Sequence, residues 1–369
     1  MKVLIQFEKK PLLFEDPEFI ITCFDPSLFA ACFNDIENAL RRGYYLAGFV
    51  SYEAGYCFEE KLRENKKYDF PLICFGAYKR PAGRGLKPPA GLSLDTFKNL
   101  RLNITQDDYF SNINTIRDYI AAGEVYQITY CVKLLFEFRE DPFSLYNLLL
   151  REQRVPYPAY IESDSFHILS CSPEMFIKKE STRAITKPMK GTWRRGNNAI
   201  SDIASRVRFQ YDSKNRAENV MIADLLRNDL GRIGSGIDAP RLFEVAGYKT
   251  LFQMTSTVTG RLEKDINIYK LFASLFPSGS VTGAPKIRAM QIIKSLEREE
   301  RRIYTGAIGY ITPARDLFFN IPIRTLLLRS GHGEMGIGGG IVWDSTPEGE
   351  WDEGMLKAKF LIALKPGML

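Results

Sequence analysis

Apolar residues recur every three or four positions in three separate segments, and this spacing predicts amphipathic helices. The first segment, residues 106–123, begins with acidic residues and ends at Gly123, as a helix with ordinary start and stop signals does. Residues 215–230 and 350–364 carry similar apolar stripes. We predict a helix in each segment.

Other segments have the pattern and composition of β-strands. Residues 44–54 and 71–78 are short runs rich in aromatic and β-branched residues. Residues 316–328 and 333–345 are strand-like runs joined around the glycine-containing turn "RSGHG". Long strands mixed with helices predict an α+β fold, in which antiparallel β-sheets pack together with helices outside.

One break in composition divides the chain. The stretch "KRPAGRGLKPPAGL", residues 79–92, is rich in proline, glycine and positive charge and has no periodicity. We therefore expect a β-rich N-terminal segment at 1–79, a linker at 80–100 and one larger domain at 101–369.

Composition narrows the functional class. The chain has 369 residues, 45% of them apolar, and a dispersed net charge of +6, which gives no sign of a nucleic-acid partner. No apolar run is long enough for a signal peptide or a membrane helix, so we expect no membrane association and a cytoplasmic location. The six cysteines include no CxxC pair. Because His167 and His332 are the only histidines, acid–base chemistry falls to carboxylates, lysine or tyrosine.

Lys190 has unusual neighbours for a surface lysine. In "ITKPMKGTWRRG" it lies between the apolar Met189 and the turn-prone pair Gly191 and Thr192. Its amine is therefore either exposed to solvent or directed at a reacting group, and the local sequence leaves both open.

Two predicted helices carry glutamates at the head of an apolar stripe. Glu218 precedes one stripe, and Glu350 and Glu353 precede the other. Glu218 either interacts favourably with the dipole at the start of its helix or belongs to a cation site. Glu353 either forms an exposed ion pair with Lys357, worth about 0.3 kcal/mol, or belongs to the same cation site. Magnesium takes one or two carboxylates together with substrate oxygens, so two such helices make a magnesium site plausible.

Two further features point to an anionic ligand. The loop "SGSVTGAPKIRAM" leads into a helix whose first turn suits Pro285, and exposed N–H groups at a helix start attract anions. It does not match a phosphate-binding P-loop, and a plain structural turn is the alternative. Arg324, in a strand-like run, is either a carboxylate ligand or a solvent-facing arginine at a sheet edge. Three glycines, Gly338 to Gly340, suit a close approach of backbone to ligand.

Taken in order, several long motifs resemble those of the chorismate-utilising enzymes, which include anthranilate, isochorismate, salicylate and aminodeoxychorismate synthases. These motifs are "SPEMF", "KPMKGT", "AENVMIADLLRNDLGRI", "QMTSTVTGRL", "PSGSVTGAPKIRAM", "YTGAIGYI", "IRTLL" and "GIGGGIVWDS". The resemblance spans roughly residues 105–369, and "GFVSYEAGY" at 48–56 looks like the N-terminal part of the family. It implies the fold of anthranilate synthase component I.

The resemblance also implies roles for particular residues. Most relatives have a small residue where this chain has Lys190, and lysine there is typical of the aminodeoxychorismate synthase branch. In that branch the lysine is thought to attack ring carbon C2 of chorismate and expel the C4 hydroxyl, after which ammonia adds at C4. Glu174, sixteen residues before Lys190, corresponds to the general acid/base.

The remaining site residues follow from the same motifs. The resemblance implies magnesium binding by Glu218 and Glu353, with Glu350 orienting or binding through water. It implies substrate binding by Arg324, Tyr304, Lys357, Thr192 and the backbone at Gly283 and Gly339. Gln253 stands where many relatives have histidine, and because glutamine cannot transfer a proton we assign it to orienting the substrate.

The resemblance finally implies partners. No unassigned stretch of this chain could hold a glutaminase, so we expect ammonia from solution or from a separate glutamine amidotransferase subunit. The product would pass to an aminodeoxychorismate lyase that makes p-aminobenzoate for folate. The alternatives are an anthranilate or isochorismate synthase that carries Lys190, and a chorismate-binding protein without catalysis.

Overall fold

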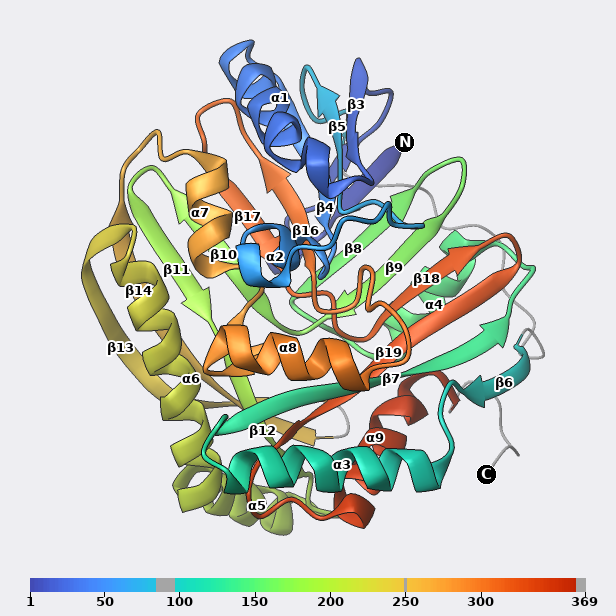
Figure 1. The fold of residues 1–369 in the computed structure, drawn as a ribbon, viewed down its shortest axis with the longest axis vertical. Coiled ribbons are helices and arrows are strands. Elements are labelled where there is room, and N and C mark those ends of the chain that lie inside the picture. Colours follow the sequence, from blue (N-terminus) through green and yellow to red (C-terminus); the bar gives the residue numbers. More distant parts are fainter. Residues whose placement is uncertain (84–96, 249–250, 363–369) are drawn as a thin grey trace.

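Two antiparallel β-sheets form the centre of the protein in a computed structural model, which describes residues 1–83, 97–248 and 251–362 (Figure 1). Within these residues the first sheet has nine strands: in order β15 (Gly283–Ala284), β7 (Gln127–Glu137), β19 (His332–Ile341), β18 (Thr325–Arg329), β9 (His167–Ser172), β8 (Tyr157–Glu162), β1 (Lys2–Ile5) and β2 (Leu12–Phe14), with β6 (Lys98–Leu102) beside β7. The second sheet has ten: β12 (Met189–Arg194), β14 (Leu251–Leu262), β11 (Arg183–Lys187), β10 (Met175–Glu180), β17 (Leu317–Asn320), β16 (Ala307–Ile311), β4 (Tyr45–Val50), β5 (Ile73–Tyr78) and β3 (Phe19–Cys23), with β13 (Gly234–Gly247) beside β14. The predicted fold class is confirmed.

Helices cover the outer faces of the two sheets (Figure 1). Their bounds are α1 (Phe29–Arg41), α2 (Ala54–Cys57), α3 (Gln106–Ala121), α4 (Pro142–Glu152), α5 (Ala199–Tyr211), α6 (Ser213–Gly231), α7 (Ile268–Leu275), α8 (Lys286–Leu296) and α9 (Pro347–Ile362). The three predicted helices are confirmed as α3, α6 and α9, although the last two residues predicted for α9, 363 and 364, lie outside the described residues. No helix in the described part of the chain is long and apolar enough to cross a membrane.

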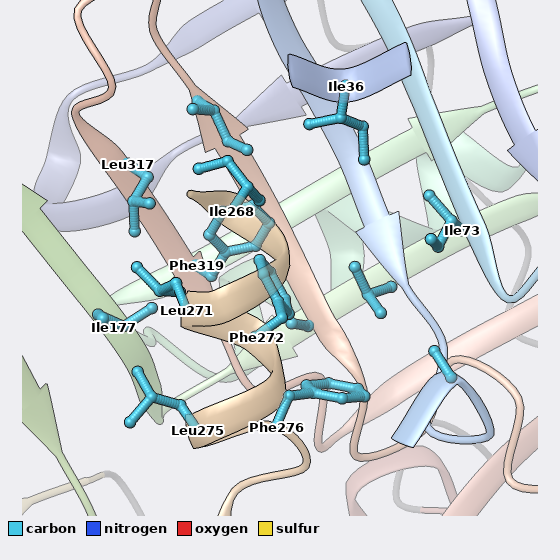
Figure 2. Close-up of a cluster of buried hydrophobic side chains, with 14 of the residues drawn as sticks. Ile36, Ile73, Ile177, Ile268, Leu271, Phe272, Leu275, Phe276, Leu317 and Phe319 are labelled. Carbon is cyan, nitrogen blue, oxygen red and sulfur yellow. The ribbon is translucent and has the colours of Figure 1, made fainter. Parts of the chain in front are cut away.

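The three largest of four apolar cores in the described residues hold these layers together. Phe7, Phe49, Ile168 and Phe318 belong to the core between the sheets, which buries side chains from both. A second core packs α3, α4, α8 and α9 on the first sheet. The third packs α1, α6 and α7 on the second sheet, and Figure 2 shows α7 placing Phe272 against Phe319 of β17. Burial of this apolar surface fixes the sheets relative to each other, and so fixes any site between them.

The N-terminal segment contains the strands β1 to β5, which belong to both sheets. β1 pairs with β8 in the first sheet, while β4 pairs with β16 in the second. The linker expected at 80–100 falls mainly on residues 84–96, outside the described residues. Its last residues, 98–100, belong to β6, which pairs with β7.

One predicted strand is interrupted. The predicted turn joins β18 to β19 as an antiparallel hairpin. The preceding run, 316–328, is not one strand, because β17 ends at Asn320 in the second sheet and β18 begins at Thr325 in the first. The chain crosses between the sheets there, and Arg324 takes a positive φ of 51°. The prediction that Arg324 lies within a strand was wrong. The alternation of apolar and polar residues continues from β17 to β18, and only the pairing of these strands with different sheets shows that the chain leaves one sheet and enters the other between them.

Candidate active site

A cavity of about 300 Å³ lies where elements of the two sheets meet α6 and α9. This volume is at the lower end of the range for small-molecule sites. The cavity is lined by eleven of the predicted site residues: Glu174, Lys190, Thr192, Glu218, Gln253, Tyr304, Arg324, Gly339, Glu350, Glu353 and Lys357. Residues more than 180 positions apart in the sequence therefore share one small volume.

Lys190 enters the cavity from a β-bulge in β12. The pairing of β12 with β14 runs from Met189 opposite Thr255 to Thr192 opposite Gln253, so β12 holds one extra residue in this interval. Gly191 adopts a positive φ of 92° there, which costs glycine little. A bulge redirects side chains, and this one directs Lys190 into the cavity. The pair that looks turn-prone in the sequence is therefore part of a bulge within a strand.

The amine of Lys190 is in an environment that favours its neutral form. Burial lowers the pKa of Lys190 below its ordinary value of 10.5, and the positive charge of Lys357 lowers it further. Glu218 opposes this effect, but its carboxylate oxygen is 4.0 Å from Nζ, at the limit of an ion pair. Only a neutral amine is a nucleophile, so the site favours the reactive form of this lysine.

Glu174 lies at another crossing between the sheets, between the end of β9 and the start of β10. Its side chain is buried, and burial raises its pKa to about 7, although hydrogen bonds from Ser280 Oγ, at 2.6 Å, and from the Met189 N–H, at 3.4 Å, oppose the rise. A carboxyl group with a pKa near neutrality can both give and accept a proton. This is the property that a general acid needs.

The glycines of β19 leave room for polar side chains. A Cβ atom on Gly340 would overlap Lys190 Nζ, and one on Gly339 would lie 2.9 Å from Glu350 Oε2. Side chains of the cavity therefore approach this backbone closely, and the expected approach of a ligand remains a prediction.

Replacing Gly340 with alanine is expected to lower the catalytic rate by about 100-fold, because the new methyl group displaces the Lys190 amine and small misplacements of reacting groups cost about that much. The fold should tolerate the change, since the atoms it meets belong to the ends of two flexible side chains, Lys190 and Gln127. Turnover and thermal unfolding of the variant would be measured together. Gly349→Ala, near the start of α9 and outside the cavity lining, is the control. Full activity in Gly340→Ala would contradict the role of this contact.

Three glutamates face the cavity from two helices. Glu218 comes from α6, and Glu350 and Glu353 come from α9. Burial and the charge of Glu353 raise the pKa of Glu350, whereas Lys357, 2.7 Å from Glu353, lowers the pKa of Glu353. Ser345 Oγ donates to Glu350 Oε1 at 2.6 Å and so fixes its orientation.

These carboxylates fit a hard divalent cation. Within the described residues no group of three His, Cys, Asp or Glu side chains is close enough to hold a metal ion alone. Magnesium usually needs only one or two carboxylates and completes its shell with water and substrate oxygens. The repulsion between Glu350 and Glu353 is one that such a cation would relieve.

Arg324 and Lys357 supply positive charge to the wall. The Arg324 guanidinium donates to Gln153 Oε1 at 3.0 Å and lies 5.8 Å from the centre of the Tyr248 ring. Lys357 Nζ donates to the carbonyl of Gly338 at 2.8 Å as well as pairing with Glu353. The Glu353–Lys357 pair is thus the helix-surface pair that the sequence allowed, and it also borders the cavity.

Gln253 and Thr192 lie opposite each other on β14 and β12. Gln253 is buried, and within the described residues its Oε1 has no hydrogen-bond partner. An unpartnered buried amide oxygen on a cavity wall is suited to bind a donor on a ligand. The expected role of Gln253 in orienting a substrate remains a prediction.

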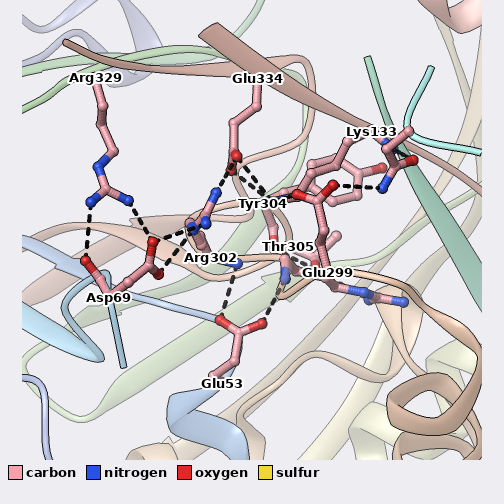
Figure 3. Close-up of polar contacts among 11 residues, drawn as sticks. Glu53, Asp69, Lys133, Glu299, Arg302, Tyr304, Thr305, Arg329 and Glu334 are labelled. Atoms are coloured by element: carbon pink, nitrogen blue, oxygen red, sulfur yellow. Dashed lines mark hydrogen bonds and ion pairs between the residues drawn. The ribbon is translucent and has the colours of Figure 1, made fainter. Parts of the chain in front are cut away.

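Tyr304 and Thr305 are held in the wall by a buried polar network that the sequence analysis did not find (Figure 3). Glu53, from the motif "GFVSYEAGY", accepts hydrogen bonds from the backbone N–H groups of Arg301, at 2.7 Å, and Arg302, at 3.0 Å. Arg301 Nη1 in turn contacts Thr305 Oγ1 at 3.2 Å. The N-terminal segment therefore anchors the chain just before two residues of the cavity.

One predicted residue does not line the cavity. Gly283 lies in β15, opposite Ile128 of β7, so its backbone is used in the sheet. Ser280 and Val281 of the same loop line the wall instead. Which residue of this loop faces the cavity depends on the pairing of β15, which is not readable from the loop sequence.

Comparison with known proteins identifies the family of this chain. The model of the chorismate binding enzyme family matches residues 86–363. Aminodeoxychorismate synthase component 1 of Klebsiella aerogenes is 36% identical over 69% of this chain and 56% of its own length. Anthranilate synthase component 1 of Aquifex aeolicus is 35% identical over 72% of this chain and 54% of its own length.

The fold is also known from solved structures. The crystal structure of anthranilate synthase component I from Streptococcus pneumoniae superposes with a TM-score of 0.79 at 23% identity, covering 98% of this chain and 90% of that one. The chain belongs to the chorismate binding enzyme family. It spans about half the length of many of the curated relatives that it matches.

Proposed function

We propose that the protein is an aminodeoxychorismate synthase component I, which converts chorismate and ammonia to 4-amino-4-deoxychorismate. The observation that supports this most is the presence of Lys190 in one cavity with Glu174: a buried amine with a lowered pKa beside a buried carboxyl with a pKa of about 7. Covalent catalysis by an amine needs a neutral nucleophile and a proton donor for the leaving group. The lowered pKa of Lys190 favours the neutral amine, and the raised pKa of Glu174 favours a proton on its carboxyl group near pH 7.

In the first proposed step, Lys190 Nζ forms a bond to ring carbon C2 of chorismate, both ring double bonds shift by one position, and the bond from C4 to its hydroxyl breaks. Glu174 gives its proton to the departing hydroxyl, which leaves as water. In the second step, ammonia bonds to C4, both double bonds shift back, and the bond from C2 to Lys190 breaks. The proton that ammonia loses returns to Glu174, so both residues are regenerated.

Chorismate carries two carboxylates, and the cavity wall offers cations for them. We assign carboxylate binding to Arg324 and Lys357, with Tyr304, Thr192, Gln253 and the backbone of Gly339 completing the substrate contacts. We further propose that Glu218 and Glu353 hold magnesium, with Glu350 orienting the site. A bound magnesium ion would neutralise a substrate carboxylate that these glutamates would otherwise repel.

Ammonia is proposed to come from a separate glutamine amidotransferase subunit or from solution. An aminodeoxychorismate lyase would then consume the product on the route to p-aminobenzoate and folate. The naming of relatives as component 1 supports a partner subunit.

Anthranilate synthase is the alternative within the family, because relatives of that name match this chain at similar identity. The two reactions differ in product mass, since anthranilate synthase eliminates pyruvate whereas aminodeoxychorismate keeps the enolpyruvyl group. Lys190 favours aminodeoxychorismate synthase over anthranilate synthase, because elimination of pyruvate does not need a covalent adduct with the enzyme.

The test is mass spectrometry of the purified protein with chorismate, a magnesium salt and an ammonium salt at pH 7 to 8. We expect a product with the mass of aminodeoxychorismate, and its formation should stop when the ammonium salt is omitted. Release of anthranilate or isochorismate would refute the proposal. Chorismate left unchanged, even with a glutamine amidotransferase and glutamine supplied, would support binding without catalysis.

A further inference from the structure

Gln127, the first residue of β7, is a buried polar side chain to which the proposed reaction assigns no role. It is 0% exposed, and neither Oε1 nor Nε2 has a hydrogen-bond partner within the described residues. The large majority of buried side-chain polar groups make at least one hydrogen bond. An amide with both groups unpartnered therefore indicates a ligand or a contact made during function.

The position of Gln127 links it to the cavity. Side chains two residues apart on a strand point to the same face, and Thr129 of β7 lines the cavity. A Cβ atom on Gly340 would lie 2.9 Å from Gln127 Nε2, and the same atom would overlap Lys190 Nζ. The carboxamide and the amine thus border the same small space above Gly340, a residue of the cavity wall.

The ion-pair partner of the Lys190 amine is distant. Its ion pair with Glu218 spans 4.0 Å, which is longer than a hydrogen bond. A half-turn of the Gln127 carboxamide exchanges the positions of its oxygen and nitrogen, which are hard to tell apart in shape. That rotation brings an amide oxygen toward Nζ.

We infer that Gln127 is a positioning residue for Lys190, whose carboxamide oxygen accepts a hydrogen bond from the amine and directs its lone pair toward the substrate. The inference rests on the proposed function for the identity of the reaction. A carboxamide suits this task because it accepts a hydrogen bond without a charge. A carboxylate in the same place would favour the protonated amine, which cannot attack.

The kinetic test is Gln127→Met, which keeps the length of the side chain and removes the acceptor. We expect kcat to fall by about 10- to 100-fold while the KM for chorismate changes less than about 2-fold, because positioning of the nucleophile acts in the transition state. A merely structural glutamine would instead lower the thermal midpoint or raise KM together with any loss of kcat. Unchanged kcat in a folded variant would overturn the inference.

The matched control is Thr186→Val. Thr186 on β11 is also buried with an unpartnered side-chain oxygen, but it is not part of the cavity wall. Removing that oxygen should leave kcat and KM unchanged. An equal loss of kcat in both variants would attribute the effect to core packing and would count against Gln127.

A crystal structure of the unmodified protein tests the contact without relying on activity. The expected distance from the Gln127 carboxamide to Lys190 Nζ is about 3 Å. If the wild type makes no aminodeoxychorismate but this contact is present, the proposed function fails and the positioning contact stands. A separation beyond about 4 Å, with Gln127 bonded elsewhere, would overturn the inference whatever the reaction.

Discussion

Lys190→Ala is expected to lower the formation of aminodeoxychorismate by at least about 1,000-fold, because it removes the nucleophile on which the proposed covalent route depends. The variant should still bind chorismate, since Arg324 and Lys357 remain in the wall. Lys190→Arg should not restore activity, because a guanidinium stays charged at any working pH. Turnover with saturating ammonium and chorismate binding by calorimetry are the measurements.

Lys187→Ala is the matched control for this prediction. Lys187 ends β11, three residues before Lys190 in the same motif, and is not in the cavity lining. It should retain full activity. Intact mass spectrometry adds a second readout, since a chorismate-derived adduct should form on the wild type and be absent from Lys190→Ala. Substantial turnover by Lys190→Ala would remove the covalent route from the proposal.

Glu174→Gln is expected to lower kcat by about 100- to 10,000-fold, which is the usual contribution of a general acid. The wild type should also lose kcat/KM as pH rises above about 7, because Glu174 then loses the proton it must donate. The residual activity of Glu174→Gln should lack this alkaline decline. A pH profile from 5.5 to 9 tests both statements, and an unchanged decline in the variant would assign it to another group.

The same substitution should stabilise the fold at alkaline pH. The folded-state pKa of Glu174 is about 7 against an ordinary value of 4.5, so folding opposes its ionisation. This cost is absent below about pH 4.5, grows through the interval between the two values and is complete above pH 7. Glutamine cannot ionise, so at pH 8.5 the free energy of unfolding should rise by up to about 3 kcal/mol, and by less at pH 5.5.

Denaturant unfolding of the wild type and of Glu174→Gln, at pH 5.5 and at pH 8.5, measures the difference in their free energies of unfolding. Glu180→Gln is the control, because Glu180, at the end of β10, is exposed. The control should change stability little at either pH. A Glu174→Gln variant that is less stable than the wild type at pH 8.5 would show that the charged carboxylate is favoured in the fold, contrary to its burial.

The sequence by itself determined the local elements and the candidate chemistry. The helical periods of α3, α6 and α9 and the glycine turn between β18 and β19 were readable, because a helix face and a hairpin depend on residues close in sequence. Long motifs pointed to the family. They also singled out Lys190 and Glu174, and the structure brings both to one cavity.

Only the tertiary structure decided which residues meet. The break of the predicted strand at Arg324, the use of Gly283 in the sheet and the anchoring of Arg301 and Arg302 by Glu53 all depend on partners far away in the chain. The approach of Gln127 to Gly340 also depends on residues far apart in the chain. These contacts form together when the core is buried. No local sequence pattern specifies them, because each of these residues is also compatible with other surroundings.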